Sequence, residues 1–457
     1  MLGRLIGLSL LVGVAAFAVP DSVSAGDWQA GVARTNITPQ EPMWMSGYAS
    51  RNHGADGKLT ELWAKAIVIA DPDGHRIAAV TLDLVGLDRE TSLAMREGIE
   101  HALQIPRANV ALFCSHTHTG PVVGNNLRSM FELNDAENRK IDVYTSKLIA
   151  DVVQTVGNAA AEMEPVTLAW ACGTATYAVN RRTNKEADVP MLRERGLLNG
   201  PVDHDVPVLS VRAGEKLKAV LFGYACHATV LDLYQWTGDH PGFAMKALEE
   251  QLPGTQAMFW AGCGADQNPL PRRTVELAKK YGEQLARSVR DVLDGAMHPI
   301  SGELKTVYTE IEIGFASIPT KEQLQQTLGS ENRYERVRAG LLLKQLESTG
   351  SVASAYPYPV QTWKLGDGPL WIILGGEVVV DYSIRLKTEL GANTTWVAGY
   401  ANDVMAYIPS ARVLKEGGYE GGGAMLYYGL PSAWSDSVED LIVGEANRQA
   451  TEVGISP

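Results

Sequence analysis

Two histidines separated by a single residue carry the strongest chemical signal in this chain. His116 and His118 occur in the segment Cys114-Ser115-His116-Thr117-His118-Thr119-Gly120-Pro121, directly after the apolar run Val110–Phe113. That run predicts a buried strand, and side chains at positions i and i+2 of a strand project to one face. Imidazole is the commonest protein ligand of zinc and the usual acid–base group near neutral pH. The spacing therefore predicts one cavity that holds both rings.

Two further residues are candidates for the same cavity. His227 follows the strand-like run Ala219–Cys226, which predicts either a third member of the histidine site or a hydrogen-bonded core histidine. Glu377 lies within an otherwise apolar stretch, where a carboxylate requires a partner because burying an unpaired charge is very costly. A metal ion is one possible partner and Arg385 is the other. Neutral nitrogen donors with one carboxylate form the mixture expected of catalytic zinc with an open position.

The remaining polar candidates are weaker. Asp266 lies just beyond an apolar run, in a loop predicted either to hydrogen-bond a metal ligand or to be an ordinary turn. His204 is expected to be a satisfied loop histidine. Surface positions are expected for His53, His75, His101 and His298. The chain has no GxSxG segment and no cysteine in a recognisable protease context, so the metal reading outranks a serine or cysteine nucleophile.

Composition limits the classes of function. The chain has 457 residues, 45% of them hydrophobic and 20% charged, which is typical of a globular enzyme. A net charge of −13 argues against nucleic-acid binding and against electrostatic docking to an anionic membrane. The four cysteines form no CxxC motif, and Cys114 and Cys226 lie in apolar runs that predict buried free thiols.

The first 25 residues predict a secretory signal peptide. Arg4 precedes the apolar run Leu5–Val19, and Val23-Ser24-Ala25 forms a small-residue cleavage site. An uncleaved N-terminal anchor is the alternative. No later segment has the ~18–20 continuous apolar residues that a membrane-spanning helix needs. The mature chain is therefore expected to be exported, to the periplasm or the extracellular space.

Apolar runs and helical periodicities alternate along the rest of the chain, which predicts an α/β fold with a layered mixed sheet and flanking helices. The absence of repeats and linkers predicts one large catalytic domain over residues 26–457. The glycine-rich segment Lys415–Gly423 lacks the pattern of a phosphate-binding loop and predicts a tight surface loop that presents Tyr419. Expected strands are 66–70, 77–85, 110–114, 206–211, 219–225, 257–260 and 371–374; expected helices are 135–163, 277–292, 319–346 and one after Ser437.

Several motifs, taken in order, resemble the catalytic domain of the neutral/alkaline (non-lysosomal) ceramidase family. Residues 31–39 are similar to its G-x-x-R-x-D-I-T-P opening, residues 46–49 to its M-G-Y-A turn, and residues 115–121 to its T-H-T-H-S-G-P block. Asn180-Arg181, His227-Ala228-Thr229 and Gly376-Glu377 resemble its N-R, H-G-T and G-E segments; Gly238-Asp239 and Gly264-Ala265-Asp266 fall where it has two G-D loops. Tyr407 and Tyr419-Glu420-Gly421 resemble its Y-x(11)-Y-E-G pattern.

The resemblance implies specific roles. His116, His227, Glu377 and Tyr407 would be zinc ligands, whereas His118, Arg181 and Tyr419 would surround the scissile amide. His118 is then not a ligand, in contrast to the simplest interpretation of the histidine pair. The chain ends soon after the tyrosine pair, so we expect it to lack the C-terminal β-rich domain of these ceramidases. It also has Asp266-Gln267-Asn268-Pro269 where the family has D-V-S-P-N.

The expected function is zinc-dependent hydrolysis of the N-acyl amide of ceramide or a related N-acyl lipid. The departures from the family pattern spare the metal residues, so hydrolase chemistry is better supported than ceramide specificity. The alternatives are a zinc hydrolase of a different N-acyl or cell-envelope substrate, a catalytically inactive secreted metal-binding protein, and metal-independent acyl transfer. The oligomeric state and the acyl-chain preference are not encoded in any pattern of the sequence.

Overall fold

The computed structural model describes residues 28–455, and the predicted signal segment lies outside them. Two β-sheets form the centre of the molecule. The larger has nine strands in the order β11-β9-β8-β6-β1-β3-β4-β5, with β13 also paired to β6. Its members are β1 (Trp28–Asn36), β3 (Trp63–Ala70), β4 (Arg76–Leu82), β5 (Val110–Cys114), β6 (Glu164–Thr174), β8 (Asp205–Ala213), β9 (Lys216–Tyr224), β11 (Gln256–Ala261) and β13 (His298–Ile300).

The smaller sheet packs against one face of the larger. Its order is β14-β15-β16-β18, and β16 pairs in parallel with β18 whereas the other pairs are antiparallel. Its strands are β14 (Leu304–Gly314), β15 (Ala355–Leu365), β16 (Leu370–Leu374) and β18 (Thr395–Ala398). Three two-stranded pairs complete the sheet structure: β2 (Gly57–Lys58) with β10 (Gln235–Trp236), β7 (Ala178–Asn180) with β12 (Gln267–Pro269), and β17 (Glu377–Val378) with β19 (Tyr407–Ile408).

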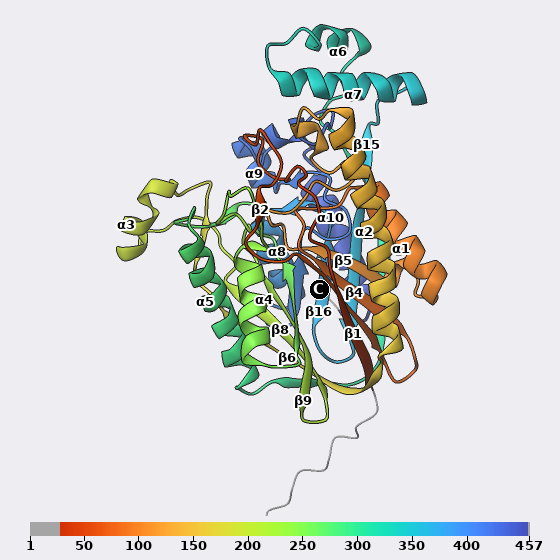
Figure 1. The fold of residues 1–457 in the computed structure, drawn as a ribbon, viewed down its shortest axis with the longest axis vertical. Helices are drawn as coiled ribbons and strands as arrows, with labels where there is room; N and C mark the ends of the chain where they lie inside the picture. Colours follow the sequence, from red (N-terminus) through yellow and green to blue (C-terminus); the bar gives the residue numbers. More distant parts are fainter. Residues whose placement is uncertain (1–27, 456–457) are drawn as a thin grey trace, which may run out of the picture.

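Helices cover the outer faces of both sheets, which gives four layers in the order helices, sheet, sheet, helices (Figure 1). Helices α1 (Arg89–Leu103), α2 (Asp135–Ala161), α4 (Asp239–Gln251) and α5 (Val275–Leu293) share a core with the larger sheet. Helices α8 (Val380–Leu390) and α10 (Val438–Glu452) share a second core with the smaller sheet. The expected layered α/β class is confirmed.

Alternation along β16 shows why its sequence is continuously apolar. Leu370, Ile372 and Leu374 face the helices of the second core, whereas Trp371 and Ile373 face the larger sheet. Both faces of this strand are therefore buried, and successive side chains of a strand point to opposite faces. Most residues of β5, β9 and β11 are buried as well, which is why apolar runs in the sequence predict these strands.

Tryptophans dominate the layer between the two sheets. The ring centroids of Trp371 lie 5.2 Å from Trp260, 5.6 Å from Trp396 and 5.8 Å from Trp363. All four side chains are fully buried. Aromatic rings at such separations bury a large apolar area and fix one relative placement of the two sheets.

The helical segment expected over residues 319–346 is interrupted. It forms α6 (Lys321–Thr327) and α7 (Arg333–Thr349), which project together from one end of the molecule (Figure 1). Thr320 caps the first helix through a reciprocal pair of hydrogen bonds with Gln323, and Asn332 caps the second.

The short helices α3 (Val189–Glu194) and α9 (Ala411–Glu416) lie elsewhere on the surface. Ser437 precedes α10 as expected, but its side chain makes no capping hydrogen bond.

Other expectations about the chain are also answered. Cys114 and Cys226 are buried free thiols, as predicted, and Cys172 and Cys263 are free as well. His53, His75, His101 and His298 are exposed. Within residues 28–455 no helix combines the length and the apolar character needed to cross a membrane.

Candidate metal centre

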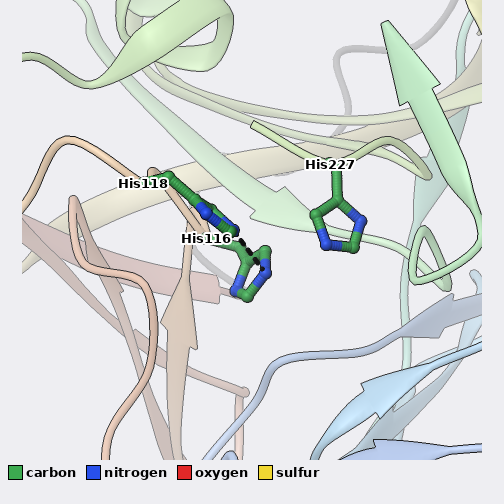
Figure 2. A group of neighbouring side chains, drawn as sticks. All are labelled: His116, His118 and His227. Atoms are coloured by element: carbon green, nitrogen blue, oxygen red, sulfur yellow. Dashed lines mark hydrogen bonds between the residues drawn. The ribbon is translucent and has the colours of Figure 1, made fainter. Parts of the chain in front are cut away.

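The predicted metal residues converge near strand ends: His116 follows β5, His227 follows β9, and Glu377 and Tyr407 begin β17 and β19. His116, His118 and His227 point their rings toward one another (Figure 2), and one nitrogen from each lies within 4.8 Å of the others. Nε2 of His116 lies 3.1 Å from Oε2 of Glu377, and Nε2 of His227 lies 3.2 Å from the same oxygen. Tyr407 places its hydroxyl 3.3 Å from Nε2 of His227.

The two histidines meet for a different reason than the one predicted. β5 ends at Cys114, so His116 and His118 lie in the loop that follows and not on the strand. His116 has a φ of 59°, a left-handed conformation that is uncommon outside glycine. The loop turn, and not the alternation of a strand, brings the two ring centroids to 4.8 Å. Such backbone outliers cluster at functional sites.

Two backbone carbonyls fix the orientation of the inner histidines. Nδ1 of His116 donates to the carbonyl of Val85 at 2.6 Å, and Nδ1 of His227 donates to the carbonyl of Gly264 at 2.8 Å. A carbonyl oxygen only accepts, so each neutral ring carries its proton on Nδ1 and presents an unprotonated Nε2. This is the outer-sphere arrangement found for metal-bound histidines. Nδ1 of His118, in contrast, is buried and has no hydrogen-bond partner.

The donor set fits a cation. The Nε2 lone pairs of His116 and His227 face an oxygen of Glu377 that has no other hydrogen-bond partner. Three buried lone-pair donors repel one another unless a positive charge lies between them. Ligand atoms in a tetrahedral site with zinc bonds of about 2.0–2.1 Å lie ~3.3 Å apart, close to the separations observed here. The second Glu377 oxygen accepts a hydrogen bond from Tyr428.

Electrostatics separate the buried groups of the site. Although burial raises the pKa of Glu377, the adjacent His116 and His227 hold it well below the usual value. Burial lowers the pKa of His227 to about 4. Burial and the neighbouring histidines lower the pKa of His118 well below its usual value. The site thus combines one carboxylate with two imidazoles, His118 and His227, whose lowered pKa values keep them neutral, the protonation state that metal binding requires of a histidine.

Arg181 is held beside the metal residues by three contacts. It donates to the Tyr407 hydroxyl at 3.1 Å, to Glu420 at 2.7 Å and to Asn268 at 3.3 Å. Burial lowers the pKa of Arg181, but Tyr407 and Glu420 raise it well above the usual value, so the guanidinium stays charged. Arg181 therefore supplies the site with a fixed positive charge that does not depend on a bound metal ion.

Tyr419 lies at the mouth of the site. Its ring centroid lies 5.2 Å from that of Tyr407, and its side chain is 44% exposed whereas Tyr407 is 4% exposed. Gly417, Gly418 and Gly422 have positive φ values, so residues 417–422 form the tight loop that was expected to present Tyr419. The loop is shorter than predicted, because Lys415 and Glu416 end α9 and Gly423 begins a short 3-10 helix. A cavity of about 560 Å³ opens here, lined in part by Arg181, Asn268, Tyr419 and Glu420.

Several neighbours of the site carry no sequence signal. Tyr428 contacts Glu377, and Tyr400 packs on His116 at 4.3 Å between ring centroids. The loop that contains Asp266 does hydrogen-bond a proposed ligand, because the Gly264 carbonyl accepts from Nδ1 of His227. The Asp266 carboxylate itself accepts from Asn180 and from the backbone of Val380. Arg385 pairs with Glu389, Glu439 and Asp440, so it is not the partner of Glu377. His204 donates to a backbone carbonyl, as a satisfied loop histidine should.

Comparison with known proteins matches the sequence of this chain to one family. A sequence model described as neutral/alkaline non-lysosomal ceramidase, N-terminal, matches residues 28–266, more than half of the chain. The chain belongs to this family. Neutral ceramidase 2 of Arabidopsis thaliana is 32% identical over 94 residues, a stretch that spans 20% of this chain and 12% of that protein. The family is one of amide hydrolases, as the resemblance implied.

Two solved structures share the fold. The neutral ceramidase from Pseudomonas aeruginosa superposes with a TM-score of 0.70 at 18% identity, covering 94% of this chain and 75% of that chain. A structure described as ceramidase complexed with C2 superposes with a TM-score of 0.70 at 19% identity, covering 94% and 76%. The chain thus spans about three quarters of the solved relatives and an eighth of the curated one.

Proposed function

We propose that this chain is a zinc-dependent amidohydrolase that cleaves the N-acyl amide of ceramide or a related N-acyl lipid, with residues 26–457 acting as its catalytic domain. The observation that carries the proposal is the meeting of two Nε2 atoms with one Glu377 oxygen, each ring tied through Nδ1 to a carbonyl. Family membership supports the reaction class, and the fold it shares with solved ceramidases supports the placement of the site.

His116, His227, Glu377 and Tyr407 would hold the zinc ion. A bound zinc ion supplies Lewis-acid polarisation of a carbonyl and lowers the pKa of a coordinated water to about 7. His118 is assigned to the substrate and not to the metal, because no carbonyl fixes its Nδ1 as one does for His116 and His227. The ring of His118 nevertheless lies in the same cluster as the rings of His116 and His227, close to the proposed metal ligands.

The chain's own groups would then stabilise the reacting amide. Arg181 presents a guanidinium that stays charged and is oriented by Glu420, suited to the negative charge that develops on the carbonyl oxygen. Tyr419 brings a hydroxyl group to the mouth of the cavity, and Nε2 of His118 lies 3.1 Å from Nε2 of His116 in the same loop. Fixed donors in a site largely closed to water lose little energy to reorganisation during the reaction.

The decisive test combines metal analysis with a substrate panel. Purified protein is expected to contain one zinc ion per chain and to hydrolyse N-acylsphingosine in a reaction that a chelator stops and zinc restores. N-acyl amino acids and N-acyl sugars, assayed in parallel, separate a ceramidase from a hydrolase of another N-acyl substrate. Stoichiometric zinc without turnover on any amide would identify a binding protein. Chelator-resistant turnover would identify metal-independent acyl transfer.

Export is the cellular part of the proposal. The sequence of residues 1–25 supports it. N-terminal sequencing of protein recovered outside the cytoplasm is expected to begin just after Ala25. Recovery of a full-length chain in the membrane fraction would instead indicate an uncleaved anchor.

A further inference from the structure

His240 is a buried histidine with no role in the site described so far. It is the second residue of α4 and is fully buried. Its Nε2 lies 3.1 Å from the backbone carbonyl of His227, and its Nδ1 lies 2.9 Å from the hydroxyl of Tyr177. Because the carbonyl only accepts, Nε2 carries the proton and Nδ1 accepts from Tyr177. The contact therefore holds the main chain at a proposed metal ligand.

Tyr177 is itself held in one orientation. Its ring stacks on Tyr281 at 4.8 Å between centroids and packs against Tyr224 at 4.7 Å. The ring is 3% exposed, so its hydroxyl has no access to bulk water. A donor fixed in this way keeps His240 in one tautomer and one ring orientation, as outer-sphere partners do for metal-bound histidines.

The residues before α4 bind the other histidine loop. The carbonyl of Thr237 accepts from the hydroxyls of Thr117 and Thr119, both at 2.7 Å. The backbone N–H of Thr237 donates to the carbonyl of Thr119 at 3.3 Å. Thr117 lies between His116 and His118, so these bonds fix the loop that carries both rings.

The turn into α4 joins the two sets of contacts. Asp239 has a φ of 55°, and its carboxylate accepts from the backbone of Leu231 at 2.8 Å and of His240 at 2.6 Å. Aspartate is among the few residues that tolerate this conformation. At Gly238 a Cβ atom would lie 2.9 Å from the Cα of Gly242, so the turn has no room for a side chain. One short segment thus contacts the loops around both histidines.

We propose that Thr237–His240, with Tyr177, is a positioning clamp that holds the loop of His116 and the loop of His227 at the separation needed to bind one metal ion. None of the clamp residues contacts the cavity or the metal donors, so they act through His116 and His227. The proposal rests on the proposed function in one respect, since it takes the ion to be zinc.

Zinc affinity of the metal-free protein, measured by competition with a chromophoric chelator, tests the clamp apart from turnover. His240→Ala is expected to weaken zinc binding by about 10–100-fold, the usual effect of losing an outer-sphere partner. His240→Gln retains an N–H donor and is expected to recover most of the affinity. Tyr177→Phe keeps the ring stack, removes the donor to Nδ1, and is expected to give an intermediate loss.

Matched controls remove equivalent hydrogen bonds elsewhere. His204 also donates to a backbone carbonyl, at 2.9 Å, and Tyr144 also donates to one, at 2.6 Å. His204→Ala and Tyr144→Phe are expected to leave zinc affinity within about threefold of wild type, because neither touches a histidine loop. Circular dichroism of each metal-free variant shows that it is folded.

The outcomes distinguish the clamp from the proposed function. Wild-type zinc affinity in folded His240→Ala and Tyr177→Phe proteins overturns the clamp and leaves the proposed function intact. A wild-type protein that binds no zinc overturns both. If His240→Ala fails to fold, Tyr177→Phe decides the question, because wild-type zinc affinity in this folded variant contradicts the clamp.

Discussion

At the scale of single residues, Glu377 is the group on which the metal site depends. Its Oε2 is buried between two unprotonated imidazole nitrogens and has no hydrogen-bond donor of its own. Removing its negative charge should therefore affect metal binding far more than folding.

Glu377→Gln is expected to lower hydrolysis by at least about 10²-fold and to abolish stoichiometric zinc, since an amide is a poor ligand and its N–H group can instead donate to His116 or His227. With chelator present, the variant is expected to unfold at a lower temperature than wild type, because a Glu377 pKa below the usual value means that the folded state stabilises the ionised carboxyl. Metal analysis and thermal unfolding measure the two effects. Glu312→Gln, at an exposed position of β14, is the control. Full zinc content in Glu377→Gln would contradict the ligand assignment.

At the scale of elements, the loop around Gly47 sets the position of His118. Gly47 has a φ of 94°, and a Cβ atom there would lie 2.4 Å from Nδ1 of His118. Arg51, in the same loop, donates to the His118 carbonyl at 3.0 Å, and Tyr48 packs on the His118 ring at 4.7 Å. The Ser46–Ala49 turn thus supports the histidine that is proposed to face the substrate.

Gly47→Ala is expected to displace His118 and to lower kcat by about 10²-fold, since small displacements of catalytic groups have effects of this size. Zinc content should remain at wild-type level. Gly74→Ala is a matched control, because Gly74 also has a positive φ, of 84°, but no atom lies within 4 Å of its added Cβ. The control should lose about 1–2 kcal/mol of stability and no activity. Equal kcat in the two variants would show that His118 does not act on the substrate.

The strands also differ in how well the sequence predicts them. β5 was predicted with its observed bounds because all five of its residues are buried. β14 and β15 were missed: β14 mixes half-exposed polar and apolar residues, and β15 contains Pro357 and Pro359, which argue against a strand. The proposed metal residues were assigned through their motifs, and the loop of residues 262–269, whose Gly264 carbonyl contacts His227, was predicted as a possible hydrogen-bond partner of a ligand. Tyr428 and the carbonyl of Val85 were not predicted. Their contacts join segments that only the tertiary fold brings together.

At the scale of the whole molecule, buried carboxyl groups couple stability to pH. Burial raises the pKa of Asp403 from 3.8 to about 7, although a hydrogen bond from Tyr356 opposes the shift. The folded protein therefore retains a proton that the unfolded chain releases over this range. The contribution of Asp403 to stability accordingly falls as pH rises from about 4 to about 7, and the penalty is constant above that range.

Asp403→Asn is expected to raise the unfolding free energy by on the order of 2–4 kcal/mol at about pH 8.5 and to change it little at about pH 4. The variant keeps an oxygen that can accept from Tyr356. Denaturant unfolding at both pH values measures the difference, and Asp73→Asn, in an exposed turn, is the control. A stability change that is the same at the two pH values would contradict a buried, protonated Asp403.

The tryptophan layer gives the molecule an optical signature of its own. Indole rings 5.2–5.8 Å apart couple electronically, so the Trp260, Trp363, Trp371 and Trp396 group should give a strong near-ultraviolet circular dichroism band that depends on its geometry. The group lies between the sheets and not at the metal residues. Separation of the two sheets can therefore be followed by this band without attaching a label to the protein, independently of the loss of metal, which metal analysis measures.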